Sequence, residues 1–133
     1  MRMKNALQTV FAVAAICLVF AGVLQAHHGT ANYDMTKLVV IKGTVTDFQF
    51  INPHVEIFID AKDDKGNVQK WQAETNSPNL LHRAGWTKDS LKRGDVITIT
   101  GNRAKDGSNL MRLDKIVLSD GKELPLANGS NIQ

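Results

Sequence analysis

The chain has 133 residues, of which 43% are hydrophobic and 22% are charged. This length and composition predict one folded domain, and they exclude a wholly disordered chain and a membrane protein with several spanning helices. The formal net charge of +3 comes from 16 basic and 13 acidic residues, which are scattered among one another. A nucleic-acid partner is not expected, because such partners select a basic stripe.

The first 26 residues have the pattern of a secretory signal peptide. A basic start with Arg2 and Lys4 precedes an apolar stretch that is densest at 10–24 and leads to Ala26. We expect cleavage after Ala26 and export to the periplasm. Cleavage after Ala21 is one alternative. An uncleaved membrane anchor is another alternative. The whole apolar stretch, 6–24, has 19 residues, which approaches the roughly 20 that span a bilayer.

Cleavage after Ala26 changes the chemistry that is available to the mature chain. It removes two of the 16 basic residues, Arg2 and Lys4, which leaves 14 against 13 acidic ones and a net charge of +1. It also removes Cys17, the single cysteine. The mature chain then has neither a thiolate metal ligand nor a cysteine nucleophile.

From Leu38 onward, strand patterns alternate with turn residues. In the second strand Val55, Ile57 and Ile59 fall on one face, because successive side chains of a strand point to opposite sides. The period changes after Ser77-Pro78, a helix start, and Gly85 marks the expected helix end. We expect strands at 38–50, 55–61, 68–75, 96–102 and 110–119, and a helix at 79–84.

This order predicts a mainly β fold: a five-stranded OB-like (oligonucleotide/oligosaccharide-binding) barrel, with one short helix between strands three and four and a signal-peptide helix in front. The expected organisation is a signal peptide at 1–26, an N-terminal arm at 27–37, the barrel domain at 38–124 and a frayed tail at 125–133. Ligands of OB barrels usually lie across strands two and three, between the loops that here span 51–54 and 105–109.

The histidines are the main candidates for chemistry. Cleavage after Ala26 makes His27 the N-terminal residue, and its free amine and imidazole form a chelate that suits Cu(II). His28 offers a second route, through the amine, the deprotonated amide and its own imidazole. His54, at the start of the second strand, is the expected partner from the barrel, since an arm of 11 residues reaches up to about 36 Å.

Other donors and other interpretations remain open. The thioethers of Met35 and Met111 are candidate ligands for Cu(I). The His27-His28 pair also fits a solvated terminus, and His54 fits a turn residue that bonds a backbone carbonyl. His82, on the predicted helix, is expected to be structural.

Two further hypotheses do not involve a metal. One is an OB binding module for an envelope glycan, a peptide or a small ligand. The other is a membrane-anchored scaffold subunit, which requires that the apolar N-terminus is retained. No catalytic pairing is legible in the sequence, so a binding protein is favoured over an enzyme. The contact residues expected for the binding module are Asn52, Trp71, Gln72, Glu74, Lys105 and Asp106.

Several short motifs, taken together, resemble the DUF6152 family of small exported bacterial proteins. The motifs are His27-His28-Gly29, Gly43-Thr44-Val45, Asn52-Pro53-His54, Trp71-Gln72-Ala73-Glu74, Gly85-Trp86, Gly94-Asp95 and Lys105-Asp106-Gly107-Ser108. The resemblance covers about residues 26–124 and implies a periplasmic, OB-like domain, but it supplies no activity. It directs attention to the histidine, asparagine, tryptophan and glutamate positions within these motifs.

The hypothesis favoured by the sequence is therefore a periplasmic copper-binding protein. His27, His28 and His54 are its expected ligands, and holding or delivering copper to a copper-handling partner is its expected role.

Overall fold

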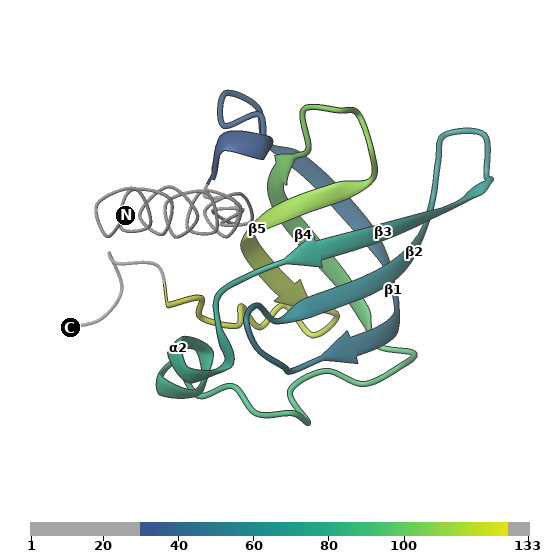
Figure 1. Cartoon of the computed structure of the whole chain (residues 1–133). Helices are drawn as coiled ribbons and strands as arrows, with labels where there is room; N and C mark the ends of the chain where they lie inside the picture. The colour runs from purple at the N-terminus through teal and green to yellow at the C-terminus, as the bar shows by residue number, and fades with distance from the viewer. Residues whose placement is uncertain (1–29, 128–133) are drawn as a thin grey trace, which may run out of the picture.

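The computed structural model describes residues 30–127, which fold into one small β-barrel (Figure 1). The expected signal peptide and the His27-His28 pair lie outside the described residues. No helix within 30–127 is both long and apolar enough to span a bilayer. In chain order the elements are the 3₁₀-helix η2 (Thr30–Asn32), β1 (Val39–Gln49), β2 (Glu56–Lys62), β3 (Val68–Glu74), α2 (Pro78–Arg83), β4 (Val96–Arg103) and β5 (Leu110–Leu118).

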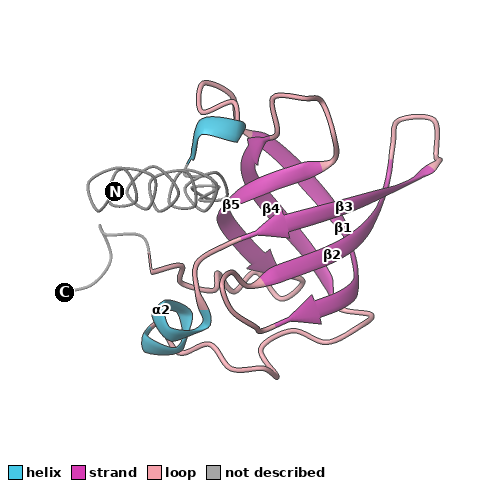
Figure 2. Ribbon diagram, in the orientation of Figure 1, coloured by secondary structure: helices cyan, strands magenta, loops and turns pink. Residues whose placement is uncertain are grey.

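The five strands close into a barrel in the order β1-β2-β3-β5-β4 (Figure 2). Closure depends on the long strand β1, which pairs with β4 along its first half and with β2 along its second. A shift in register between Val45 and Asp47 bends β1 from one partner to the other. Together with the single helix between β3 and β4, this is the OB-like topology that the sequence predicts, and the five strands and helix lie within two residues of the expected bounds.

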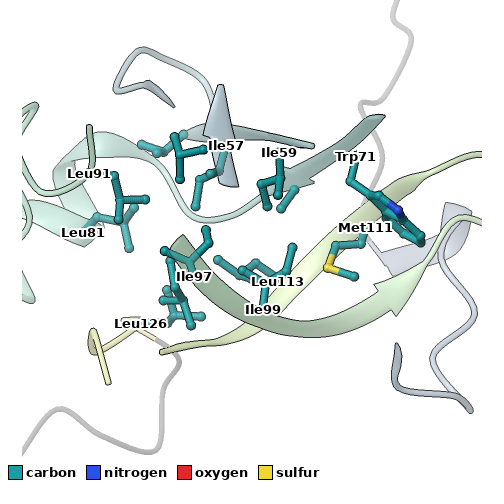
Figure 3. Close-up of a cluster of buried hydrophobic side chains, with 14 of the residues drawn as sticks. Ile57, Ile59, Trp71, Leu81, Leu91, Ile97, Ile99, Met111, Leu113 and Leu126 are labelled. Carbon is teal, nitrogen blue, oxygen red and sulfur yellow. The ribbon is translucent and has the colours of Figure 1, made fainter. Parts of the chain in front are cut away.

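Alternation along each strand separates a buried face from an outer face. In β2, Ile57 and Ile59 are buried, whereas Glu56, Phe58 and Asp60 remain partly accessible on the outer side. Figure 3 shows the resulting core, with Trp71 and Met111 at one end and Leu81 and Leu91 at the other. Its largest fully buried side chains are Trp86, Ile57, Ile59, Leu81, Ile97, Ile99, Met111 and Ile116.

The C-terminal segment closes one end of this core, which differs from the expected frayed tail. Trp86 is 1% exposed, and its indole Nε1 donates a hydrogen bond of 2.8 Å to the carbonyl of Pro125. Leu126 is 6% exposed and packs in the core. The packed domain therefore extends beyond residue 124, because the indole needs an acceptor and Leu126 buries apolar surface.

Gly43 lets β1 pass close to β2, because it has no side chain at the point of closest approach. A Cβ atom at Gly43 would lie 2.5 Å from Ile59 Cγ2 and 2.6 Å from the Asp60 carbonyl oxygen. We expect Gly43→Ala to lower the free energy of unfolding by about 1–3 kcal/mol, measured by denaturant unfolding. The control Lys42→Ala, at the exposed neighbouring position, should change it by less than about 0.5 kcal/mol. Equal stability of the two variants would contradict the close approach.

Candidate functional site

The end of the N-terminal arm is fixed to the barrel by backbone pairing. Tyr33 forms an isolated β-bridge with Ala104, and the amide of Lys105 donates to the carbonyl of Asn32 over 2.9 Å. The buried side chain of Asn102 adds two bonds of 2.9 Å, in which its Nδ2 donates to two carbonyls of the arm. The described part of the arm therefore has one defined position beside the end of β4.

Tyr33 also ties the arm to β3 through its side chain. The ring is 4% exposed, and the hydroxyl donates a hydrogen bond of 3.0 Å to Glu74 Oε2. Burial, followed by the nearby negative charge of Glu74, raises the pKa of Tyr33 to about 12. The phenol consequently keeps its proton at neutral pH and remains a hydrogen-bond donor to Glu74.

The second oxygen of Glu74 faces His54. Oε1 lies 3.6 Å from His54 Nε2, while His54 Nδ1 lies 3.2 Å from the carbonyl oxygen of Thr75. A carbonyl only accepts hydrogen bonds, so Nδ1 carries a proton and donates it, which assigns the tautomer of a neutral ring. In that ring Nε2 has a lone pair directed toward a carboxylate. A proton or a metal cation at this position would convert the repulsion into an attraction.

This arrangement matches the usual environment of a metal-binding histidine. Such residues commonly donate one ring N–H to a backbone carbonyl or a carboxylate, which orients the other nitrogen toward the metal. The side chain of His54 is 40% exposed, so a cation can reach Nε2 from solvent. The backbone provides part of the orientation, since the amide of Thr75 donates to the carbonyl of Val55 and the amide of Val55 donates to the carbonyl of Asn76, next to His54.

The outer face around Glu74 carries further charge. Glu56 is directly opposite Glu74 in the β2–β3 register, and Arg112 is its partner in the β3–β5 register. Two carboxylates opposite each other repel, and a cation beside them reduces that cost. Arg112 supplies one such charge on the β5 side. On the other side, the carboxylate of Glu74 faces His54.

A metal site commonly needs three or four His, Cys, Asp or Glu side chains around one point. Residues 30–127 contain no such group of three or more. His54 and Glu74 supply two donors, so they form at most half of a metal site. The expected ligands His27 and His28 lie just before the first described residue, Thr30. The structure neither adds them to the pair nor separates them from it.

The two methionines named as candidate ligands and the helix histidine have clear positions. The proposal that Met111 donates a thioether is wrong, because its side chain is 0% exposed and packs in the core. Its place could have been anticipated, since Met111 alternates in phase with buried Leu113. Met35 is 51% exposed and lines a groove with Thr30. His82 lies on α2, where Nδ1 is 3.2 Å from the Trp86 carbonyl, in agreement with a structural role.

The residues expected to bind a ligand do not gather in one place. Trp71 and Gln72 line a groove of about 410 Å³ with Ser108 and Asn109 of the β4–β5 loop. Glu74 belongs with His54, and Asn52 is exposed in the β1–β2 loop.

The two loop residues expected in that contact set do not line the groove. Lys105 lines a smaller hollow beside Asp34 and the start of β1. Asp106 accepts a bond of 2.9 Å from the amide of Ser108, and its pKa is lowered by that residue's hydroxyl and amide. Asp106 therefore shapes the turn.

Sequence reasoning missed Tyr33 and Arg103. Tyr33 is the single tyrosine and stands in an otherwise polar arm, which is the signal that could have identified it as an anchor. Arg103 holds the β4–β5 loop through bonds to Gly107, Ser108 and Asn109. No local pattern shows this role, because it depends on the turn bringing the loop back over the strand.

Comparison with known proteins establishes the family. The family described as "Family of unknown function (DUF6152)" matches residues 15–111, and the chain belongs to it. No curated protein matches the chain.

Among solved structures, the chain resembles the mitochondrial single-stranded DNA binding protein Rim1 of S. cerevisiae. The TM-score is 0.48 at 10% sequence identity, and the match covers 62% of this chain and 93% of that one. The OB-like assignment follows from the strand order and closure of the barrel.

The contacts of Tyr33 predict that its hydroxyl loses its proton only at high pH, which ultraviolet absorbance can follow. Tyr33 is the only tyrosine, so the ultraviolet absorbance of tyrosinate should rise with a midpoint near pH 12 in the folded protein and near pH 10 when unfolded. Glu74→Gln should lower the folded midpoint, because it removes the adjacent negative charge. Since the pKa is raised on folding, the stability it contributes is complete below pH 10 and is lost as the pH rises through 12. Tyr33→Phe should lack this loss. A folded midpoint near 10 would show that Tyr33 is not held as described.

Proposed function

We propose that this DUF6152 family member is an exported copper-binding protein, in which the N-terminal His27 and the adjacent His28 bind the metal together with His54. The observation that carries the proposal is the set of contacts made by Glu74. Its two oxygens join Tyr33 of the arm and His54 of the barrel, over 3.0 Å and 3.6 Å respectively. The segment that follows the two histidines is thus anchored beside the barrel histidine.

Only a short stretch of chain separates His27 from the described part of the arm. Thr30 lines a groove of about 440 Å³ together with Asn76, which follows the Thr75 carbonyl that orients His54. His27 precedes Thr30 by three residues, a length that spans at most about 10 Å when extended. The arm can therefore carry its terminal amine and imidazoles to the neighbourhood of His54 without disturbing the anchor at Tyr33.

The donor types favour copper. Imidazole and amine nitrogens bind Cu(II) more strongly than the other divalent first-row metals, and both lose their protons at little cost near neutral pH. The neighbouring carboxylates of Glu56 and Glu74 favour a cation at this face. The role proposed for this site is to hold copper or to pass it to a partner in the periplasm.

Copper titration of the chain that begins at His27 tests the ligand set. We expect His54→Ala to weaken Cu(II) binding by at least about tenfold, because it removes one nitrogen donor. An alanine placed ahead of His27 should weaken it to a similar degree, because it displaces the amine. The control His82→Ala removes an imidazole from α2 and should leave the affinity unchanged. Unchanged affinity in the first two variants would contradict the proposed site.

The proposal also requires the correct first residue. Mass spectrometry of the natively exported chain should give a mass that begins at His27 and, under non-denaturing conditions, one retained copper ion. A mature chain that begins elsewhere, or that keeps its apolar segment, would contradict the copper site. A retained segment would favour the membrane-anchored scaffold.

A second candidate function is favoured by the groove beside the β4–β5 loop. Phe58 offers an aromatic face there, while Gln72, Ser108 and Asn109 offer amide and hydroxyl groups. An apolar platform with a few polar groups suits a neutral glycan. This candidate uses the face opposite the core of β2 and β3, and it needs no metal.

An N-acetylhexosamine oligosaccharide is the probe for this groove. If the second candidate is correct, metal-stripped protein should bind it, and Gln72→Ala should weaken binding by about tenfold through the loss of amide hydrogen bonds. Asn79→Ala, on exposed α2, is the matched amide control and should have no effect. Binding that is absent, or that is the same in both variants, would exclude the groove. The buried Trp71 is unsuitable for this test, because truncating it would open the core.

A further inference from the structure

The two ends of the barrel are closed differently. α2 lies at one end, in the lower part of Figure 1. Trp86, which follows α2, packs in the core with Leu126 and bonds to the carbonyl of Pro125. At the opposite end the start of β1, the β2–β3 hairpin and the β4–β5 loop surround a cavity of about 430 Å³. We call this cavity the barrel mouth. Its lining includes the apolar side chains of Trp71, Ile41 and Ala61. Its charged lining residues are Lys42, Lys62, Asp63, Asp64 and Arg103.

Arg103 is held rigidly at this rim. Its Nε donates to the carbonyl of Ser108 over 2.8 Å, and its Nη2 donates to the Gly107 carbonyl and to Asn109 Oδ1 over 2.5 and 2.6 Å. The guanidinium carbon lies 5.1 Å from the centre of the Trp71 ring, which adds a cation–π contact. The other amine, Nη1, makes no hydrogen bond with any residue of the described chain. Arg103 therefore presents an oriented donor whose position is already determined.

The acids near the mouth do not neutralise this donor. Asp63 accepts hydrogen bonds from the amides of Lys65 and Asn67 and from Gln69 Nε2, and these bonds lower its pKa. Its oxygens thus build the β2–β3 turn. Asp64 lies exposed at the hairpin tip. Among residues 30–127, neither Lys42, Lys62 nor Arg103 takes part in an ion pair. Asp63 and Asp64 also line the cavity, so three cations face two carboxylates and one positive charge is left in excess.

We propose that the barrel mouth is a binding site for a small organic anion. A carboxylate or phosphate group docks on Nη1 of Arg103 and the ammonium groups of Lys42 and Lys62, and the body of the ligand packs against Trp71. The volume suits a ligand of metabolite size, and barrel mouths are common places for such sites. Holding the loop requires only Nε and Nη2 of Arg103, so the free Nη1 is left for recognition.

The barrel mouth is separate from the proposed copper site at His54. His54 and Glu74 lie at the start of β2 and the end of β3, whereas the mouth lies at the other ends of the same strands. The two sites can therefore be occupied, or shown to be absent, independently.

Fluorescence of Trp71 tests the inference. The Trp86→Phe background leaves Trp71 as the single tryptophan, and it lines the cavity. The probes are a hexuronate, a hexose phosphate and the uncharged parent hexose. We expect saturable quenching by at least one charged probe and none by the hexose. The two charged probes distinguish a carboxylate site from a phosphate site. Quenching by none of the probes, or equally by the hexose, would overturn the proposal.

Charge variants provide the second measurement. Lys42→Gln combined with Lys62→Gln changes exposed side chains, so the fold should persist, and it should weaken binding by about tenfold through lost charge-assisted bonds. Lys92→Gln combined with Arg93→Gln removes the same charge at the far end and should leave binding unchanged. If both double variants weakened binding equally, the attraction would depend on net charge alone, which would contradict a specific site at the barrel mouth.

Discussion

The carboxylate of Glu74 is the point on which the arrangement of this molecule depends. It accepts the buried hydroxyl of Tyr33 with one oxygen and faces the ring of His54 with the other. A hydrogen bond to a charged group contributes about 1.5–3 kcal/mol, which does not offset the cost of ordering several residues of an arm. The burial of the Tyr33 ring and the two bonds from Asn102 provide the remainder. The arm is therefore held by several contacts, of which the bond to Glu74 is the one that reaches the histidine.

The barrel separates tasks by position. The end beneath α2 is filled by Trp86, Leu81 and Leu126 and serves stability. The opposite end holds a cavity lined by three cations and two carboxylates. The outer face of β3 carries Glu74 at its last residue, where the arm arrives. A closed barrel allows this separation, because its core is complete inside the ring of strands and leaves the outer face and the mouth free for binding.

Most of the fold could be predicted because its signals are local. Alternation in β2, the sequence Ser77-Pro78 before the helix and the left-handed Gly85 after it act over a few residues, and each was found in the expected place. Met111 could have been placed by the same alternation. The frayed tail was expected because nothing in residues 125–127 reveals that Trp86 needs an acceptor far along the chain.

The candidate site could be predicted only in part, because its contacts join distant segments. His54 could be singled out by its place at the start of a strand. Its partners could not, since Glu74 and Tyr33 are separated by 41 positions and meet only when β3 and the arm are packed. Arg103 escaped notice for the same reason. A sequence shows which residue types suit a given chemistry. Whether those residues lie close together depends on the folded barrel.

The most direct test of the central claim is paramagnetic broadening of backbone amide resonances by substoichiometric Cu(II), in the chain that begins at His27. We predict that resonances of His54 and Thr75 broaden together with those of the arm up to Tyr33, while those of His82 on α2 and Asp64 at the tip of the β2–β3 hairpin persist. Broadening confined to the first residues of the arm, with the resonance of His54 unaffected, would show that the two segments do not share a metal.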